Sequence, residues 1–525
     1  MNHVLKTALL IALTLGLVVL SGIYRSRHLE QRPMHGDEAN QAVRTGILLD
    51  EGRYHYDPTD HHGPVLYYAA VPFCRWTAPT FAETTEANFR WVPLTFSLMT
   101  LLFMLGLYSP SGHALFRTPA GVLAAVALTA LSPAMNYYSR FFIQESMFVT
   151  FLTGMLVCAT VYFKPQASTR QRVWATLGFG AFVGLAAATK ETVVLSIAAA
   201  LLALPLTCSF TTMRRAWSLQ HAVLAIGAAA GVAALFFSSF FTYPQGLYDA
   251  LFATVKAYFS RATAVPEHQH PWHFYLALLF GWKYGRGPLW TELGPLTPLI
   301  LIAVASGLAH IRKTAQSRDP QTTWTWYLLL YTVILAALYS AIPYKTPWCM
   351  LAFLHGFILL AAVGADRLVH WIAAPTAPKI RRMGGLVVVL LALFLVRFQL
   401  TQSDRACFRL AADPRNPYVY AHTGTDALNL VAEINQHAQK LQGFKTPIAV
   451  AAPPADTWPL PWYLRKYETI GYWQHAGEIP AEFKPAILIV AADQGDVADQ
   501  RFGAGKQATF YGIRPGVLLT AFLPK

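Results

Sequence analysis

Two acidic residues, Asp37 and Glu38, stand next to each other just after the first hydrophobic stretch of the sequence. The other hydrophobic stretches hold almost no acid, so a carboxylate pair at the edge of one calls for a chemical reason. At the first turn of a helix a carboxylate stays ionised, and an ionised carboxylate can serve as a general base. The simpler alternative is that Asp37 only caps the helix. The polar residues around the pair favour a site.

The loop around this pair is crowded with side chains that titrate or stack on sugars. We predict that substrate contacts come from His35, Asp60, His61, His62 and Tyr67. Small and apolar residues from Ala39 to Ile47 recur at helical spacing, which predicts an amphipathic helix near 38–52. Such a helix would lie along a membrane surface with its apolar face down, and the acidic pair would open it.

Composition indicates a membrane protein. Of 525 residues, 54% are hydrophobic and 13% are charged, whereas soluble proteins carry about 25% charged residues. Apolar runs of about 20 residues, long enough to cross a bilayer, recur along the chain. We predict eleven spans, at 5–24, 90–108, 119–137, 143–163, 173–189, 192–210, 221–241, 294–311, 323–342, 348–365 and 384–400. The first is read as a permanent anchor, because it is too long for a signal core and lacks a cleavage site.

Charge gives the predicted orientation. A net charge of +14 would suggest nucleic acid as the partner of a soluble protein, but here the basic residues gather in every second short loop. Basic loops stay in the cytoplasm, so the chain is predicted to be a multi-pass protein of the inner (plasma) membrane. The loops 25–89 and 242–293 then face outward, as does the tail from about residue 401.

Further candidate residues lie at the same outer level. Arg140 and Glu145 join two spans, and an acid at the membrane edge is a functional candidate unless it only pairs with a nearby arginine. The cations Lys190, Arg261 and Lys345 mark ends of spans or of a surface helix predicted at 247–261. One such cation alone would be snorkelling, whereas several at one level favour a phosphate-binding site.

The remaining outer candidates are Glu191, His268 and His270. The histidine-rich stretch 268–273 fits no standard zinc spacing, so hydrogen bonding to a sugar or a pyrophosphate-like group is preferred, and the participation of a divalent metal stays open. Of five cysteines, Cys74 and Cys407 would face outward, but the sequence does not predict that they pair.

The tail 401–525 is more polar than the predicted membrane domain, residues 1–400. Its pattern predicts a helix at 426–440, a strand at 446–452, a short aromatic helix at 458–467, and strands at 468–473, 485–491 and twice near 508–521. Alternating elements of this kind predict a small α/β domain. The sequence contains no P-loop, GxSxG, HExxH or dinucleotide fingerprint.

A reaction outside the membrane needs an activated donor that arrives through the bilayer, because nucleotide sugars and ATP are cytoplasmic. A polyprenyl-phosphate sugar meets this need, since its lipid stays in the membrane and its phosphate leaves. Such a transfer requires a base for the acceptor and cations for the departing phosphate. Asp37 and the lysine and arginine set are suited to these tasks.

On these residues the chain resembles GT-C glycosyltransferases of the protein O-mannosyltransferase and aminoarabinose-transferase superfamily, and most of all the prokaryotic flippase-activity-associated branch. In that superfamily an Asp-Glu pair in the first outer loop supplies the base, which Asp37 and Glu38 match. A second acid in the next outer loop is matched by Glu145, after Arg140-Phe141-Phe142. The resemblance implies a multi-span GT-C fold and an inverting transfer, with Glu38 and Glu145 positioning the acceptor or holding a metal.

One motif departs from the family. Mannosyltransferases usually show His-Lys-Pro-Pro in the first loop, whereas this chain reads His62-Gly63-Pro64-Val65. The missing lysine leaves Lys190, Arg261 or Lys345 to contact the donor phosphate.

Two other classes of function remain open. A lipid-linked-sugar flippase or transporter would explain the spans, but its ionisable residues usually lie in mid-membrane. A non-catalytic partner of a glycosylation complex is the other alternative. The sequence specifies neither the sugar nor the acceptor, which is a glycan, lipid or protein, nor the oligomeric state.

Overall fold

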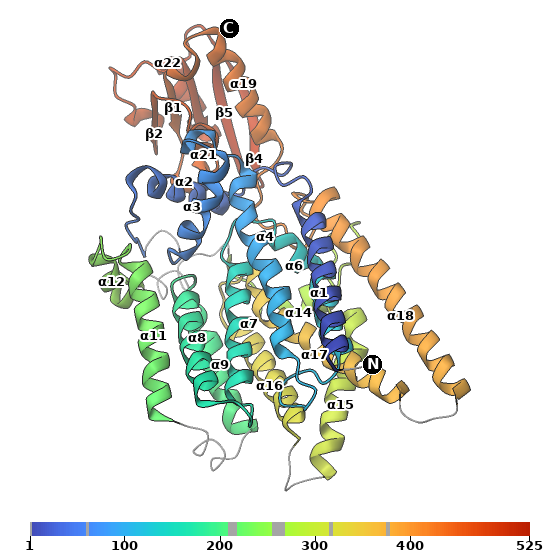
Figure 1. Ribbon diagram of the computed structural model, residues 1–525. Coiled ribbons are helices and arrows are strands. Elements are labelled where there is room, and N and C mark those ends of the chain that lie inside the picture. Colours follow the sequence, from blue (N-terminus) through green and yellow to red (C-terminus); the bar gives the residue numbers. More distant parts are fainter. Residues whose placement is uncertain (1–2, 59–61, 208–217, 255–267, 314–318, 374–377) are drawn as a thin grey trace.

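The computed structural model describes residues 3–58, 62–207, 218–254, 268–313, 319–373 and 378–525. A bundle of long helices carries a small domain at one end, with the first loop between the two (Figure 1). The predicted fold class, a multi-helical membrane protein with a small C-terminal domain that contains a sheet, is confirmed.

Each of the eleven predicted spans overlaps a helix. They are α1 (His3–Ser26), α4 (Glu86–Phe103), α5 (Pro119–Leu131), α7 (Glu145–Tyr162), α8 (Thr169–Ala187), α9 (Val193–Thr207), α11 (Leu219–Phe237), α15 (Thr297–Lys313), α16 (Pro320–Ala341), α17 (Leu351–Ala373) and α18 (Pro378–Asp404). Within the described residues, seven helical segments are long and apolar enough to cross a membrane, and three more apolar helices are shorter.

The predicted span 119–137 is two helices. α5 ends at Leu131 because Ser132 begins a new helix, α6 (Pro133–Tyr138). The Ser132 hydroxyl accepts a hydrogen bond from the Met135 amide, and Pro133 occupies the first turn, where its missing N–H is not needed. This break brings Arg140 and its neighbours to the end of the bundle that carries the C-terminal domain.

Small residues allow α8 and α11 to approach each other closely. A Cβ added at Gly180 of α8 would lie 2.2 Å from the Ala225 carbonyl oxygen of α11, and one at Gly184 would lie 2.5 Å from that of Ala229. Such approach of two backbones is typical of small residues spaced four apart in membrane helices.

The first loop forms a helical layer above the bundle. It contains α2 (Gly36–Glu51), α3 (Val65–Thr77) and a short 3-10 turn, η1 (Phe81–Glu83). The predicted helix near 38–52 is therefore present, and its position along a membrane surface stays a prediction. Ala39 and Ala42 are fully buried, and Gly46 packs against Phe81, because α2 packs against α3 and against α21 (Leu460–Tyr463) of the C-terminal domain.

The second predicted surface helix is described only for its first residues. α12 (Gln245–Tyr248) continues as a π-helical turn, η3 (Asp249–Ala253), and the remainder of 247–261 lies largely outside the described residues. The short helix α14 (Phe274–Phe280) precedes α15.

The C-terminal domain is a mixed five-stranded sheet in the order β2-β1-β3-β5-β4. Its strands are β1 (Ile448–Ala451), β2 (Ile470–Trp473), β3 (Ile487–Ala491), β4 (Lys506–Arg514) and β5 (Val517–Pro524). β1 pairs in parallel with β2 and β3, whereas β5 runs antiparallel to β3 and β4. Alternate residues of β1 and β3 pack against α19 (Asp426–Lys440) on one face and α22 (Gly495–Phe502) on the other.

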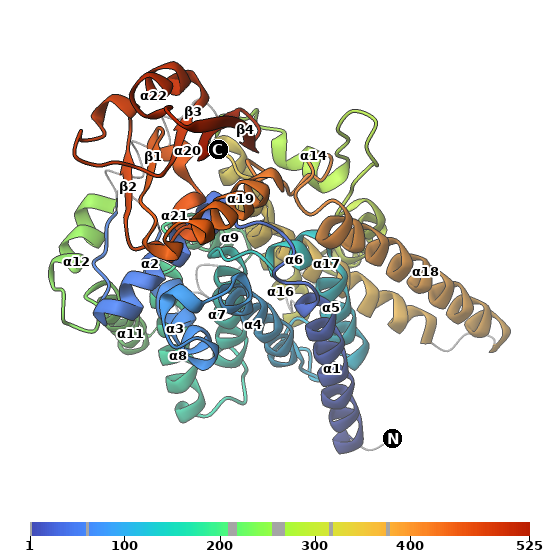
Figure 2. The same ribbon diagram turned by 90° about the horizontal axis from the view of Figure 1, so that it is seen from above.

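The C-terminal domain contacts the first loop directly. Seen from above, it lies over the α2 end of the bundle (Figure 2). The Met34 amide donates to the Tyr463 hydroxyl over 2.9 Å, and the Thr423 hydroxyl donates to the Met34 carbonyl over 2.7 Å. The cysteines among the described residues, Cys74, Cys158, Cys349 and Cys407, are free thiols.

Candidate active site

Asp37 occupies the first turn of α2, and His35 caps that helix. The His35 Nδ1 accepts a hydrogen bond from the Asp37 amide over 3.0 Å, and its Nε2 donates to the Tyr420 carbonyl over 2.9 Å. This pattern requires a neutral imidazole, and burial lowers the pKa of His35, which agrees with it. The histidine therefore fixes the backbone beneath Asp37.

The Asp37 carboxylate itself is open to solvent. Its side chain is 44% exposed, and the only ion-pair contact it makes with the described residues is to the His35 Nδ1, 3.8 Å away. Because that nitrogen already accepts a hydrogen bond from the amide, it offers no proton to the carboxylate. Asp37 is thus rigidly placed yet chemically available, as a general base must be.

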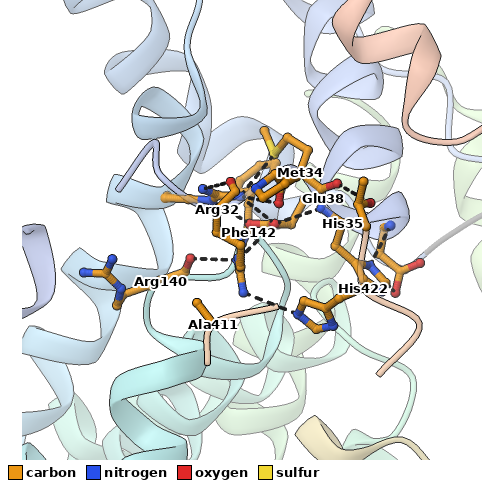
Figure 3. A network of polar contacts seen from close by, with 12 residues as sticks. Arg32, Met34, His35, Glu38, Arg140, Phe142, Ala411 and His422 are labelled. Atoms are coloured by element: carbon orange, nitrogen blue, oxygen red, sulfur yellow. Dashed lines mark hydrogen bonds and ion pairs between the residues drawn. The ribbon is translucent and has the colours of Figure 1, made fainter. Parts of the chain in front are cut away.

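Glu38 lies in the opposite environment. It is fully buried, and Arg90 binds both of its oxygens at 2.9 Å through Nε and Nη2. Arg32 adds a third charged contact at 3.0 Å, and the amides of Phe142 and His35 donate as well (Figure 3). Although burial alone would raise it, the two arginines hold the pKa of Glu38 at about 2.

Arg140 is committed to the backbone. Its guanidinium donates to the carbonyl groups of Arg25, Arg27 and His28 at the C-terminal end of α1, and its own carbonyl accepts from Arg32. These contacts satisfy carbonyl groups that a helix end leaves without partners. Arg140 therefore joins α1 to the loop that contains Phe142.

Glu145 and Lys190 form a buried ion pair between α7 and the connection that follows α8. Both side chains are about 4% exposed. The Lys190 ammonium also lies 3.4 Å from the Cys349 thiol, in the 3-10 turn η6 (Pro347–Met350) that precedes α17. The pair therefore joins α7 to the connection between α8 and α9, beside this turn.

The first loop is docked onto the same connection. The His62 Nδ1 lies 2.7 Å from a Glu191 carboxylate oxygen, and the Val65 amide donates to the Ala188 carbonyl over 3.1 Å. Burial alone would raise the pKa of Glu191, but His62 lowers it overall. Tyr67 is buried farther in, with its ring 4.7 Å from that of Tyr54.

Gly63 allows the first loop to approach the segment at Ala188 closely. A larger residue at this position is therefore expected to lower the stability of the fold. A Cβ at Gly63 would lie 2.2 Å from the Ala188 carbonyl oxygen, a backbone atom that cannot move aside. We expect Gly63→Ala to destabilise the protein by about 1–3 kcal/mol, as overpacking typically does. Thermal unfolding in detergent measures this.

Gly16→Ala is the matched control, because nothing lies within 4 Å of a Cβ at Gly16. Equal unfolding temperatures for the two variants would contradict the docking of the first loop on Ala188.

Lys345 is held near the two predicted histidines. Its ammonium donates to the carbonyl groups of His270 (2.9 Å) and Ile342, and the rings of His268 and His270 both face the Tyr420 hydroxyl, at 2.6 and 3.3 Å. Among the described residues, no carboxylate lies within ion-pair distance of Lys345. Its positive charge is therefore not compensated by any acid that the structure describes.

Tyr344 links these groups to Asp37. Burial raises the pKa of Tyr344 most, the Asp37 carboxylate raises it further, and the Lys190 ammonium lowers it. Asp37 and Lys190 therefore both lie within electrostatic range of the same hydroxyl, beside Lys345. Of the predicted site residues, Asp60, His61 and Arg261 lie outside the described residues.

The sequence did not single out Arg32, Arg90, Tyr344, Tyr420 or His422. Arg90 had a signal, because a charged residue in the first turns of an apolar span needs a partner. The segment with Tyr420 and His422 had no such signal, because it lies in the polar tail, far along the sequence from the first loop that it contacts. Among described residues, no group of three His, Cys, Asp or Glu is placed to hold a metal ion.

Comparison with known proteins comes from a family model and from solved structures. Residues 69–243 match the family model described as dolichyl-phosphate-mannose-protein mannosyltransferase. No curated protein is a significant match to this sequence.

Two solved structures share the fold at low identity. ArnT from Cupriavidus metallidurans bound to undecaprenyl phosphate superposes with a TM-score of 0.64 at 14% identity, covering 99% of this chain and 98% of that one. The oligosaccharyltransferase AglB from Archaeoglobus fulgidus, in complex with an inhibitory peptide and a dolichol-phosphate, gives a TM-score of 0.55 at 11% identity, covering 96% and 74%.

Proposed function

We propose that this chain, which matches the dolichyl-phosphate-mannose-protein mannosyltransferase family over residues 69–243, transfers a sugar from a polyprenyl phosphate to an acceptor hydroxyl. The transfer takes place on the extracytoplasmic face of the plasma membrane. The observation that carries this proposal is an available carboxylate, Asp37, on a helix whose cap, His35, binds Tyr420. The Tyr420 hydroxyl is held by His268 and His270, and the His270 carbonyl binds the Lys345 ammonium. The orientation rests on the basic loops.

The proposed reaction is a single displacement. An Asp37 oxygen takes the proton of the acceptor hydroxyl as that oxygen attacks the anomeric carbon. The bond from this carbon to the phosphate oxygen breaks, and its electron pair leaves with the polyprenyl phosphate. Attack opposite the leaving group inverts the anomeric configuration. Lys345, with Lys190 and Arg261, stabilises the charge that develops on the phosphate.

The other predicted residues take supporting roles in this proposal. Glu38 is saturated with donors, so it holds the loop through Arg32 and Arg90 rather than binding the acceptor. Glu145 fixes Lys190, and Glu191 fixes His62. His268 and His270 orient the Tyr420 hydroxyl toward the donor head group.

The donor class draws support from proteins of similar fold. The ArnT structure contains undecaprenyl phosphate and the AglB structure contains a dolichol-phosphate. Membership of the flippase-activity-associated branch stays a prediction, as does the acceptor, which is a glycan, a lipid or a protein.

Reconstitution tests the proposal against its alternatives. The purified protein, in liposomes that contain a radiolabelled polyprenyl-phosphate mannose, should release polyprenyl phosphate and form a labelled product with added acceptors. Label that crosses the bilayer without leaving its lipid would indicate a flippase instead. An inert preparation that gains transfer only with a second protein would indicate a non-catalytic partner.

Lys345 provides a sharper prediction. We expect Lys345→Gln to raise the KM for the donor by about 10- to 100-fold, because a hydrogen bond to a charged group is worth about 1.5–3 kcal/mol. Donor titration in the liposome assay measures it, with Lys440→Gln on the exposed face of α19 as the control. An unchanged KM would remove Lys345 from the phosphate site.

A further inference from the structure

A cavity lies between the far end of α3 and the start of α4, and none of the described residues that line it belongs to the candidate active site. Its volume is about 570 Å³, within the range of small-molecule sites. Two tryptophans line it, Trp76 at the end of α3 and Trp91 in α4, and they are 88% and 39% exposed. Two carboxylates, Glu30 and Glu83, complete the wall. None of the described residues that line the cavity is a lysine or arginine.

The cavity lies beside the ends of two candidate spans. The candidate span of α4 starts at Glu86, so Trp91 lies just inside it, and Glu30 follows shortly after the span that ends at Ser26. Head groups of lipids occupy this level of a bilayer, and tryptophans are enriched there.

Most polar groups of the lining are already used. The Asn88 amide donates to the Phe73 carbonyl and to the Thr77 hydroxyl, and its oxygen accepts from the Thr85 amide and hydroxyl. These bonds fasten α3 to α4 and shape the cavity. They also consume the donors that a sugar ring would need.

The polar atoms of the lining that remain available are carboxylate oxygens, which accept hydrogen bonds. Glu30 has no hydrogen bond or ion pair with the described residues, and Glu83 accepts only two bonds of 3.3 Å from Thr80. Acceptor carboxylates beside exposed indole faces suit an organic cation, which needs no donors and is attracted by aromatic rings.

We propose that this cavity binds an ammonium group, presented either by the head group of a zwitterionic lipid or by a soluble amine. The site is separate from the transferase centre and does not depend on the proposed reaction. One carboxylate contacts the cation while the indole of Trp76 or Trp91 covers its face.

Lipid retention tests the proposal directly. The full-length protein is taken from nanodiscs that contain equal phosphatidylethanolamine and phosphatidylglycerol, and native mass spectrometry counts the lipids it keeps. We expect the wild-type protein to retain phosphatidylethanolamine. The double variant Glu30→Gln/Glu83→Gln should retain about tenfold less of this lipid, because both carboxylates that could pair with its ammonium group are removed. Trp76→Ala/Trp91→Ala should show a similar loss.

Matched controls separate the site from general surface effects. Glu51→Gln removes an exposed carboxylate of α2, and Trp272→Ala removes a tryptophan that is 67% exposed elsewhere. Both should retain lipid as wild type does.

A second measurement needs no variant. Titration of the wild-type protein with ethanolamine should show saturable binding that competes with the retained lipid. Ethanolamine binding that depends on Glu30 and Glu83, without lipid selectivity, would assign the site to a soluble amine and still support ammonium recognition. Equal retention of both lipids by all variants, with no ethanolamine binding, would overturn the proposal and leave Trp76 and Trp91 as membrane-surface anchors.

Discussion

Replacing Asp37 with asparagine should reduce sugar transfer by about 10²- to 10⁴-fold, the usual loss when a general base is removed. The variant keeps the shape of the side chain and the hydrogen bond from its amide to His35, so α2 should still begin at the same place. The loss should fall on kcat rather than on the KM for the donor, because the proposed phosphate contacts are unchanged. Single-turnover assays in liposomes measure it.

Asp50→Asn provides the matched control for this substitution. Asp50 lies on the same helix and is exposed, far from the His35 cap. It should transfer at the wild-type rate. Wild-type transfer by Asp37→Asn would falsify the assignment of the base.

Replacing Glu38 with glutamine should destabilise the fold by about 3–5 kcal/mol, the typical result of removing one partner from a buried ion pair. The guanidinium groups of Arg32 and Arg90 are buried, and among the described residues neither of them has an ion pair with another acid. Single domains are stable by about 5–15 kcal/mol, so little would remain. Chemical unfolding in detergent and the yield of monodisperse protein measure the effect, with Glu51→Gln on the exposed end of α2 as control.

The same ion pairs give a pH dependence with a definite sign. The pKa of Glu38 falls from an ordinary 4.5 to about 2 on folding, so the folded state favours the ionised form. The contribution of ionised Glu38 to the free energy of unfolding is complete above about pH 4.5. It is lost as the pH falls toward 2, which lowers this free energy by about 3 kcal/mol. Glu38→Gln should lack this component of the acid sensitivity. An identical acid profile for the variant and wild type would contradict the role of the arginine pairs.

Hydropathy predicted the helices of the bundle because a bilayer leaves few alternatives to a long apolar helix. It also placed α2 and most of the C-terminal strands, since their patterns are local. The break at Ser132 was missed, because both halves of 119–137 are apolar and only the cap distinguishes them.

The contacts of the candidate site were harder to predict. Asp37 and Glu38 look equivalent in the sequence, yet one is open and the other buried, and only the positions of Arg32 and Arg90 separate them. The match of Asp37 to the family motif identified the candidate base, whereas Tyr420, which binds its helix cap, and Tyr344 lie hundreds of residues away in the sequence. No local pattern encodes such pairings.

The tail residues that hold the first loop have a consequence for biosynthesis. His35 and Met34 are held by Tyr420 and Thr423, which follow them by 385 and 389 positions. During translation, the first loop is synthesised early and the segment around Tyr420 is synthesised late. The first helices can therefore insert into the membrane long before the contacts that hold the start of α2 can form. A nascent or prematurely ended chain would therefore sit in the membrane as an inert precursor. In the proposed reaction, activity would then arise only after the segment around Tyr420 and Thr423 has been made, which would protect donor lipids from shorter copies of the chain.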